Sequence, residues 1–227
     1  MVAVGDSAYQ APASDSEAVD PLVMRGFVLA LAHLHTNGTS EEGRKTQSLA
    51  APARRAQSSA EASGSTCRLD LQVLEFTCGK QSHVCRGVWS AELHNQCDMA
   101  DMAVVLLGFL EEVRHGPATA ERLKELKDNG GYTIPLDMYT DSYSIFSYLH
   151  AQHLKFPTEK GTYFHLAYLP ELLEKGVISS YTWVDTHDMF VDGMTKGSLD
   201  RAALVSIMHG QWTLRHKYET HYERTQT

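Results

Sequence analysis

The chain has 227 residues, of which 43% are hydrophobic and 21% charged, and its formal net charge at pH 7 is −8. This composition is typical of an ordinary folded protein and excludes a collagen-like, coiled-coil or wholly disordered chain. The negative charge argues against a protein that coats DNA regardless of sequence, because such proteins carry a basic face.

Two apolar segments near the N-terminus predict strands. Residues 2–4 form a short apolar run that ends in the acidic sequence Gly5-Asp6-Ser7, and residues 24–33 form a longer one. Residues 36–66 are rich in Ser, Ala, Gly and Gln and show no apolar period, so we expect a disordered insertion there. A third strand is predicted at residues 69–77, where apolar and polar residues alternate.

The rest of the chain alternates between predicted helices and strands. A long helix is expected over residues 90–113, with Ser90 as its N-cap and one apolar stripe along its length. Strands are expected at residues 134–139 and 177–184. A polar helix is expected at residues 118–128, where Asn129-Gly130-Gly131 would end it, and further helices at residues 143–150, 161–175, 189–196 and 199–209. Three successive strands followed by this alternation predict an α/β fold, in which helices flank a mixed five-stranded sheet.

The four cysteines, Cys67, Cys78, Cys85 and Cys97, form no CxxC pair, and the N-terminus has no basic segment followed by an apolar core. We therefore expect no signal peptide and reduced thiols in an intracellular protein, cytoplasmic by default, with a nuclear location left open. The spacing of these thiols and the 12 histidines does not support a zinc site built from both. No apolar run approaches the roughly 18 residues of a membrane span, so no membrane partner is expected.

Four acidic residues fall where predicted elements begin or end. Asp6 follows the first strand, Glu92 opens the long helix, Asp141 follows the fourth strand, and Asp192 begins the last helical region. If the first and fourth strands are neighbours, Asp6 and Asp141 emerge side by side, and two helix starts could bring the other acids to them. Four carboxylates can be ionised together only if cations neutralise them, and hard oxygen ligands select Mg²⁺ or Mn²⁺. The chain has 28 acidic residues, so spacing alone leaves solvated surface charges as the alternative.

Short motifs around these acids resemble those of one family. Residues 79–84, followed by Ser90-Ala91-Glu92-Leu93, resemble the pattern KQ..V..S..AE, in which the Glu is a metal ligand. Tyr139-Thr140-Asp141-Ser142 resembles a strand that ends in TDS, and residues 183–186 with 191–196 resemble W..T…ADxLTK. The family is the ribonuclease H domain of Ty1/copia-type retrotransposon Pol polyproteins, and the resemblance covers nearly all of residues 1–210.

The N-terminal motif and several later positions, among them Trp89, His187-Asp188 and the long insertion at residues 36–66, depart from the family pattern. Residues 4–9 are similar to the first strand of the family, which carries the first catalytic Asp, but they read Asp-Ser-Ala-Tyr instead of Asp-Ala-Ser-aromatic. Val191 stands where the family has Ala before the last Asp. All four carboxylates are nevertheless retained.

The resemblance implies an RNase H-like domain over residues 1–210 and a C-terminal tail at residues 211–227, which we expect to be frayed and partly helical. It implies an endonuclease that hydrolyses the RNA strand of an RNA–DNA hybrid. Asp6, Glu92, Asp141 and Asp192 would be its catalytic residues and the ligands of two Mg²⁺ or Mn²⁺ ions.

The resemblance implies two partners, the RNA–DNA hybrid and a reverse transcriptase domain. The second is implied because ribonuclease H domains of this family normally follow a reverse transcriptase domain. The alternative function is a catalytically inactive RNase H-like relic that binds nucleic acid or a protein. The four intact acids favour the nuclease, whereas the drifted motifs and the net charge favour the relic.

Overall fold

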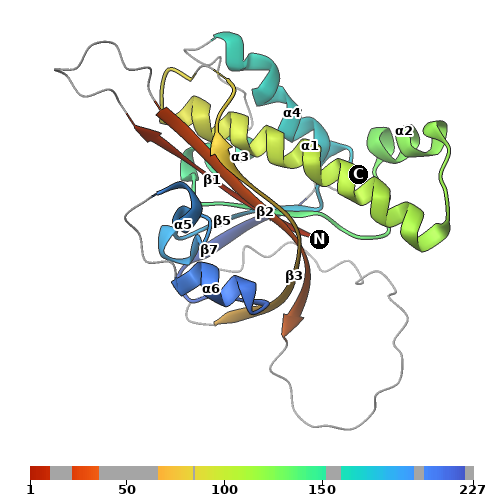
Figure 1. The fold of residues 1–227 in the computed structure, drawn as a ribbon. Coiled ribbons are helices and arrows are strands. Elements are labelled where there is room, and N and C mark those ends of the chain that lie inside the picture. Colours follow the sequence, from red (N-terminus) through yellow and green to blue (C-terminus); the bar gives the residue numbers. More distant parts are fainter. Residues whose placement is uncertain (11–21, 36–65, 84, 152–159, 197–201, 223–227) are drawn as a thin grey trace, which may run out of the picture.

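A computed structural model describes residues 1–10, 22–35, 66–83, 85–151, 160–196 and 202–222 (Figure 1). The expected insertion at residues 36–66 therefore lies outside the described residues, apart from its last position. Within the described ranges, no helix is both long and apolar enough to cross a membrane.

A mixed sheet of seven strands lies at the centre of the fold, in the order β6-β3-β2-β1-β4-β5-β7. The strands are β1 (Val2–Gln10), β2 (Leu22–His35), β3 (Cys67–Lys80), β4 (Asp137–Thr140), β5 (Ser180–Val184), β6 (Gln211–Leu214) and β7 (Tyr218–Tyr222). The first three pair antiparallel, and β4 and β5 continue the sheet in parallel with β1. The α/β class is confirmed, but the sheet has seven strands rather than five.

The two additional strands come from the C-terminal tail, so the prediction of a frayed, partly helical end is wrong there. β6 pairs with β3, and β7 pairs with β5, both antiparallel. Trp212 and Leu214 on β6 are buried, and the indole of Trp212 donates a hydrogen bond to the Asp188 backbone oxygen. The buried Asp188 carboxylate accepts hydrogen bonds at 2.8 Å from the backbone amides of Arg215 and His216, which fixes the turn between the strands.

Two predicted boundaries also differ from the structure. The first strand does not end before Asp6 as predicted, because β1 continues through Gly5-Asp6-Ser7 and pairs Asp6 with Gly26 of β2. The long helix begins at Val88 with Gly87 as its N-cap, and Ser90 lies inside it with its hydroxyl bonded to the Gly87 backbone oxygen.

Helices cover both faces of the sheet (Figure 1). They are α1 (Val88–His115), α2 (Ala120–Asn129), α3 (Tyr143–His150), α4 (Tyr163–Glu174), α5 (Asp192–Thr195) and α6 (Ala202–Met208). Short 3₁₀ turns, η1 (Lys160–Thr162) and η2 (Thr186–Asp188), precede α4 and α5. One core lies beneath α1, α3 and α4, and a second lies beneath α5 and α6.

The central strand β1 is buried on both of its faces. Successive side chains of a strand point to opposite faces. Ala3 accordingly belongs to the core beneath α1, whereas Val2 and Val4 belong to the core beneath α5 and α6. The same alternation places Asp6 on the face that α5 covers.

Two glycines allow helices to lie directly on this part of the sheet. A Cβ atom added to Gly5 would lie 2.9 Å from Sδ of Met99 on α1. A Cβ atom added to Gly26 would lie 2.9 Å from Cγ2 of Thr195 and 3.2 Å from Cγ1 of Val191. Because Gly26 pairs with Asp6, its missing side chain lets α5 approach the first acidic residue.

We expect Gly26→Val to lower the free energy of unfolding by about 1–3 kcal/mol, because the new side chain overlaps the buried Thr195 methyl group. Urea denaturation measures this loss. Gly79→Val is the matched control, since a Cβ atom there meets nothing within 4 Å, and its effect should stay within about 0.5 kcal/mol. Equal losses in the two variants would contradict close packing of α5 on β2.

Candidate metal centre

Three of the four predicted acids meet where β4 ends beside the middle of β1. One carboxylate oxygen from each of Asp6, Asp141 and Asp192 lies within 4.8 Å of the other two. Asp6 is on β1, Asp141 directly follows β4, and Asp192 is the first residue of α5. Since β1 and β4 are parallel neighbours in register from Val2 with Asp137, the end of β4 brings Asp141 beside Asp6 in the middle of β1, and α5 supplies the third acid. These three residues are the acidic cluster.

Glu92, the fourth predicted acid, borders the acidic cluster from α1. Its side chain is buried, and its Oε2 has no hydrogen-bond partner among the described residues. Burial, together with the negative charges of Asp6 and Asp141, raises the pKa of Glu92 well above its usual value. Glu92 is thus within electrostatic reach of the cluster, although it is not one of the three acids within 4.8 Å of one another.

The cluster strongly disfavours a full set of negative charges. Burial and the charge of Asp141 raise the pKa of Asp6 to about 8, although Thr195 Oγ1 donates a hydrogen bond of 2.5 Å to its Oδ2. Burial and the charge of Asp192 also raise the pKa of Asp141. Without a cation, the cluster therefore retains protons at pH values where exposed carboxylates are ionised.

Lys196 supplies part of the missing positive charge. Its Nζ lies 2.7 Å from Oδ1 of Asp192 and 3.8 Å from Oδ2 of Asp6. Although burial opposes the charge on this amine, the hydrogen bond to Asp192 and the nearby acids raise the pKa of Lys196. One ammonium group cannot balance four ionised carboxylates, so full ionisation of the site would leave an excess of negative charge.

Buried amide side chains hold the backbone beneath the cluster. Asn95 Nδ2 donates to the backbone oxygens of Asp6 at 2.8 Å and Gly26 at 3.2 Å, and Gln96 Nε2 donates to that of Gly5 at 3.1 Å. These bonds attach α1 to β1 and β2 without using the carboxylates. Neither amide was predicted from the sequence, where their one signal is two adjacent polar residues within a stretch of predicted buried helix.

The donor set fits a hard divalent cation. It consists of carboxylate oxygens, one of them a buried oxygen of Glu92 that no described residue satisfies. Carboxylate oxygens are the ligands that Mg²⁺ and Mn²⁺ prefer. The site could therefore bind such an ion, and ion binding would relieve the repulsion that raises these pKa values.

Comparisons with protein-family models, with curated proteins and with solved structures find no match to this chain.

The raised pKa of Asp6 predicts that the metal-free protein loses stability as the pH rises. In the unfolded chain this acid ionises near pH 4, whereas in the folded chain it ionises near pH 8. Between these values the folded state binds more protons, so the free energy of unfolding should fall from about pH 4 to about pH 8, by at most about 5 kcal/mol. Urea denaturation in EDTA at several pH values measures this slope.

Asp6→Asn should reduce the slope and make the protein more stable than the wild type at pH 8 in EDTA, with little difference near pH 4. Glu174→Gln removes an exposed carboxylate and is the control, for which the wild-type slope should remain. A wild-type stability that is constant or rising between pH 5 and pH 8 would contradict the described environment of Asp6.

Proposed function

We propose that this protein is a metal-dependent endonuclease of the ribonuclease H type, which hydrolyses the RNA strand of RNA–DNA hybrids. The observation that carries the proposal is the convergence of Asp6 from within β1, Asp141 from the end of β4 and Asp192 from the start of α5, with Glu92 beside them. An oxygen-rich acidic site of this kind is suited to holding two divalent ions around a phosphodiester.

The order of the inner strands supports the proposal. The order β3-β2-β1-β4-β5, with three antiparallel strands followed by two parallel ones, agrees with the five-strand sheet that the motif resemblance implies. The motif residues Asp141 and Asp192 also lie in the acidic cluster. A retrotransposon origin and a reverse transcriptase partner belong to the same proposal and rest on the motif resemblance.

In this mechanism the four carboxylates would hold two divalent ions, which supply activation of the attacking water and stabilisation of the departing 3′ oxygen. Thr195 orients Asp6 by donating to its Oδ2, which leaves Oδ1 for a ligand. Lys196 has 35% of its side chain exposed, so its amine lies between the cluster and solvent, where it would attract a phosphate group. Contacts to 2′-hydroxyl groups would distinguish the RNA strand from the DNA strand.

A second candidate is an inactive module of the same fold that binds nucleic acid or a protein. The observation that favours it is that side chains of the protein itself pair with two acids of the cluster. Lys196 pairs with Asp192, and Thr195 bonds to Asp6, so both acids have partners without any metal ion. The two candidates differ in their need for a divalent cation.

If the cluster binds Mg²⁺, the ion should stabilise the folded protein by mass action. We expect 10 mM Mg²⁺ at pH 8 to raise the melting temperature by about 3–6 °C relative to EDTA, measured by differential scanning fluorimetry. Asp141→Asn should abolish most of this shift, and Glu174→Gln should retain it. No Mg²⁺- or Mn²⁺-dependent shift in the wild type would contradict an assembled metal site.

The decisive experiment is cleavage of an end-labelled RNA–DNA hybrid in Mg²⁺ or Mn²⁺. We expect cleavage of the RNA strand alone and a loss of at least about a hundredfold in Asp141→Asn, since losing even an outer partner of a metal ligand costs 10–100-fold. Glu174→Gln should cleave as the wild type does. Hybrid binding by folded protein, without cleavage in either metal, would contradict the nuclease and support the binding module.

A further inference from the structure

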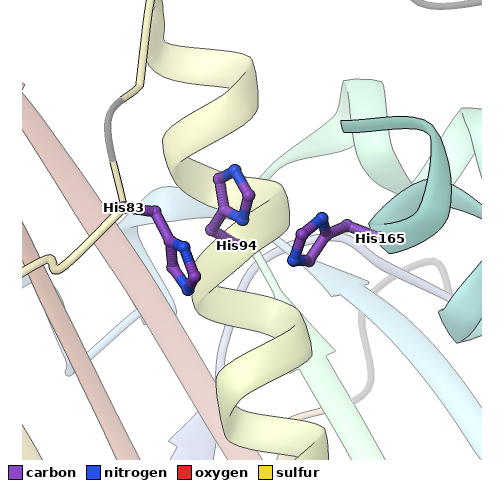
Figure 2. A group of neighbouring side chains, drawn as sticks. All are labelled: His83, His94 and His165. Carbon is purple, nitrogen blue, oxygen red and sulfur yellow. The ribbon is translucent and has the colours of Figure 1, made fainter. Parts of the chain in front are cut away.

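Three histidines lie together at α1, outside the acidic cluster. Figure 2 shows His94 projecting from α1, His83 from the segment before that helix, and His165 from α4. The ring centroids are 4.5 Å apart for His83 and His94, 4.3 Å for His94 and His165, and 5.7 Å for His83 and His165. One ring nitrogen of each lies within 4.8 Å of those of the other two.

Two members of this histidine triad are held by packed helices. His94 is buried on α1, and His165 lies in the first turn of α4. The Nδ1 atom of His165 is buried and has no hydrogen-bond partner among the described residues. Cys97, one helical turn after His94, donates through its Sγ to the backbone oxygen of His165 at 3.4 Å, which attaches the two helices to each other.

The third member can adjust its position. His83 lies between β3 and α1, and 43% of its side chain is exposed. Its Nε2 is 3.8 Å from Oδ1 of Asp98, which is also ion-paired with Arg25. Histidines that bind metals commonly direct their other ring nitrogen to a carboxylate, so Asp98 is placed to orient this ring.

We propose that His83, His94 and His165 form a binding site for Zn²⁺. Imidazole nitrogen suits zinc, and three histidines with a fourth position open to water form a known type of zinc site. A zinc–nitrogen bond of about 2.0–2.1 Å in tetrahedral geometry separates the nitrogens by about 3.4 Å. The three nitrogens now lie within 4.8 Å of one another, so zinc binding requires them to approach by at most about 1.4 Å, to which movement of the exposed His83 ring can contribute.

This site differs from the acidic cluster in position and in chemistry. Glu92 and His94 are two residues apart on α1, so their side chains leave the helix about 200° from each other. The acidic cluster offers oxygen atoms, which suit Mg²⁺, whereas the triad offers nitrogen atoms, which suit zinc. Zinc at the triad would join α1, α4 and the segment that leads into α1, and it does not require the proposed nuclease activity.

The alternative for the same three side chains is plain packing of neutral imidazole rings. His83 and His94 are stacked with an interplanar angle of 13°, and His165 meets both edge-on. Such contacts stabilise a cluster of aromatic rings without any ion. Zinc titration of the protein and of single variants separates the two cases.

The test is isothermal titration calorimetry of the full chain with ZnCl₂, after EDTA treatment and dialysis, in buffer that contains Mg²⁺ to fill the acidic cluster. We expect one Zn²⁺ per chain, with affinity reduced at least about a hundredfold in His83→Gln and in His165→Gln. A saturating excess of Zn²⁺ should raise the wild-type melting temperature by about 5–10 °C. Replacement by Co²⁺ should give the visible absorption of a tetrahedral nitrogen-ligated ion.

Three control variants show whether the ion binds at the histidine triad or elsewhere. His115→Gln removes an exposed histidine of α1, and His187→Gln removes one ring of the surface pair that His187 forms with His216; both should bind zinc as the wild type does. Asp141→Asn should also retain the zinc site. Because His83 is exposed, its variant should fold even if His165→Gln does not.

Absence of zinc binding by the wild type at 100 μM Zn²⁺ would overturn the proposal. So would unchanged binding in His83→Gln, or loss of binding in Asp141→Asn alone, which would assign the ion to the acidic cluster.

Discussion

The arrangement of the site follows from one constraint, a carboxylate placed on a strand that is buried on both faces. Asp6 continues the alternation of Val2 and Val4, whose side chains fill the core beneath α5 and α6, so its own side chain enters that region. An isolated charge in such a place is costly unless it is paired or neutralised. The side chains around Asp6 must therefore donate hydrogen bonds to it or supply positive charge.

The side chains around Asp6 stabilise its charge only in part. Thr195 and Lys196, both contributed by the α5 segment, reach Asp6 and Asp192. The close approach of this segment requires Gly26, because any larger residue would push Thr195 away from the strand. The packing of α5 on Gly26 therefore determines which groups reach Asp6, the partner of Gly26 in the β1–β2 ladder. Bringing three more acids to the same place then creates a charge excess that a divalent cation is well suited to remove.

Much of the architecture follows from patterns that can be read along the sequence. Alternation and apolar runs located the first five strands, and the stripe on α1 is buried at Leu93, Cys97, Ala100 and Leu107. The two last strands escaped detection because they are short edge strands. Trp212 and Leu214 give β6 too few alternating positions to signal a strand, and its stability comes from Asp188 and from pairing with β3. Edge strands depend on their partners more than on their own sequence.

Asp141 and Asp192 were predictable as candidates because they sit at element boundaries. Asp6 and Glu92 were found because they lie close to predicted boundaries, although the structure places both inside their elements. The amides that support the acids were not predictable, since Asn95 and Gln96 are satisfied by backbone oxygens of β1 and β2 that no local pattern can reveal. The histidine triad was even harder to predict from the sequence than the two amides. Its members are separated by 11 and by 71 positions, without the close spacing by which a zinc motif is usually recognised, and packing of α4 against α1 brings them together.

Helix α1 therefore links two regions of different chemistry. Its first turns carry Glu92 toward oxygen ligands and His94 toward nitrogen ligands, while Asn95 and Gln96 fix the same turns to the central strands. Because a helix is stiff over this length, a constraint on His94 also limits how far Glu92 can move. The two sets of ligands differ in hardness, so two metals present together would sort between them instead of competing for one site. If both ions are bound, the position of Glu92 would be limited by its own ion and, through the stiffness of α1, by zinc at His94.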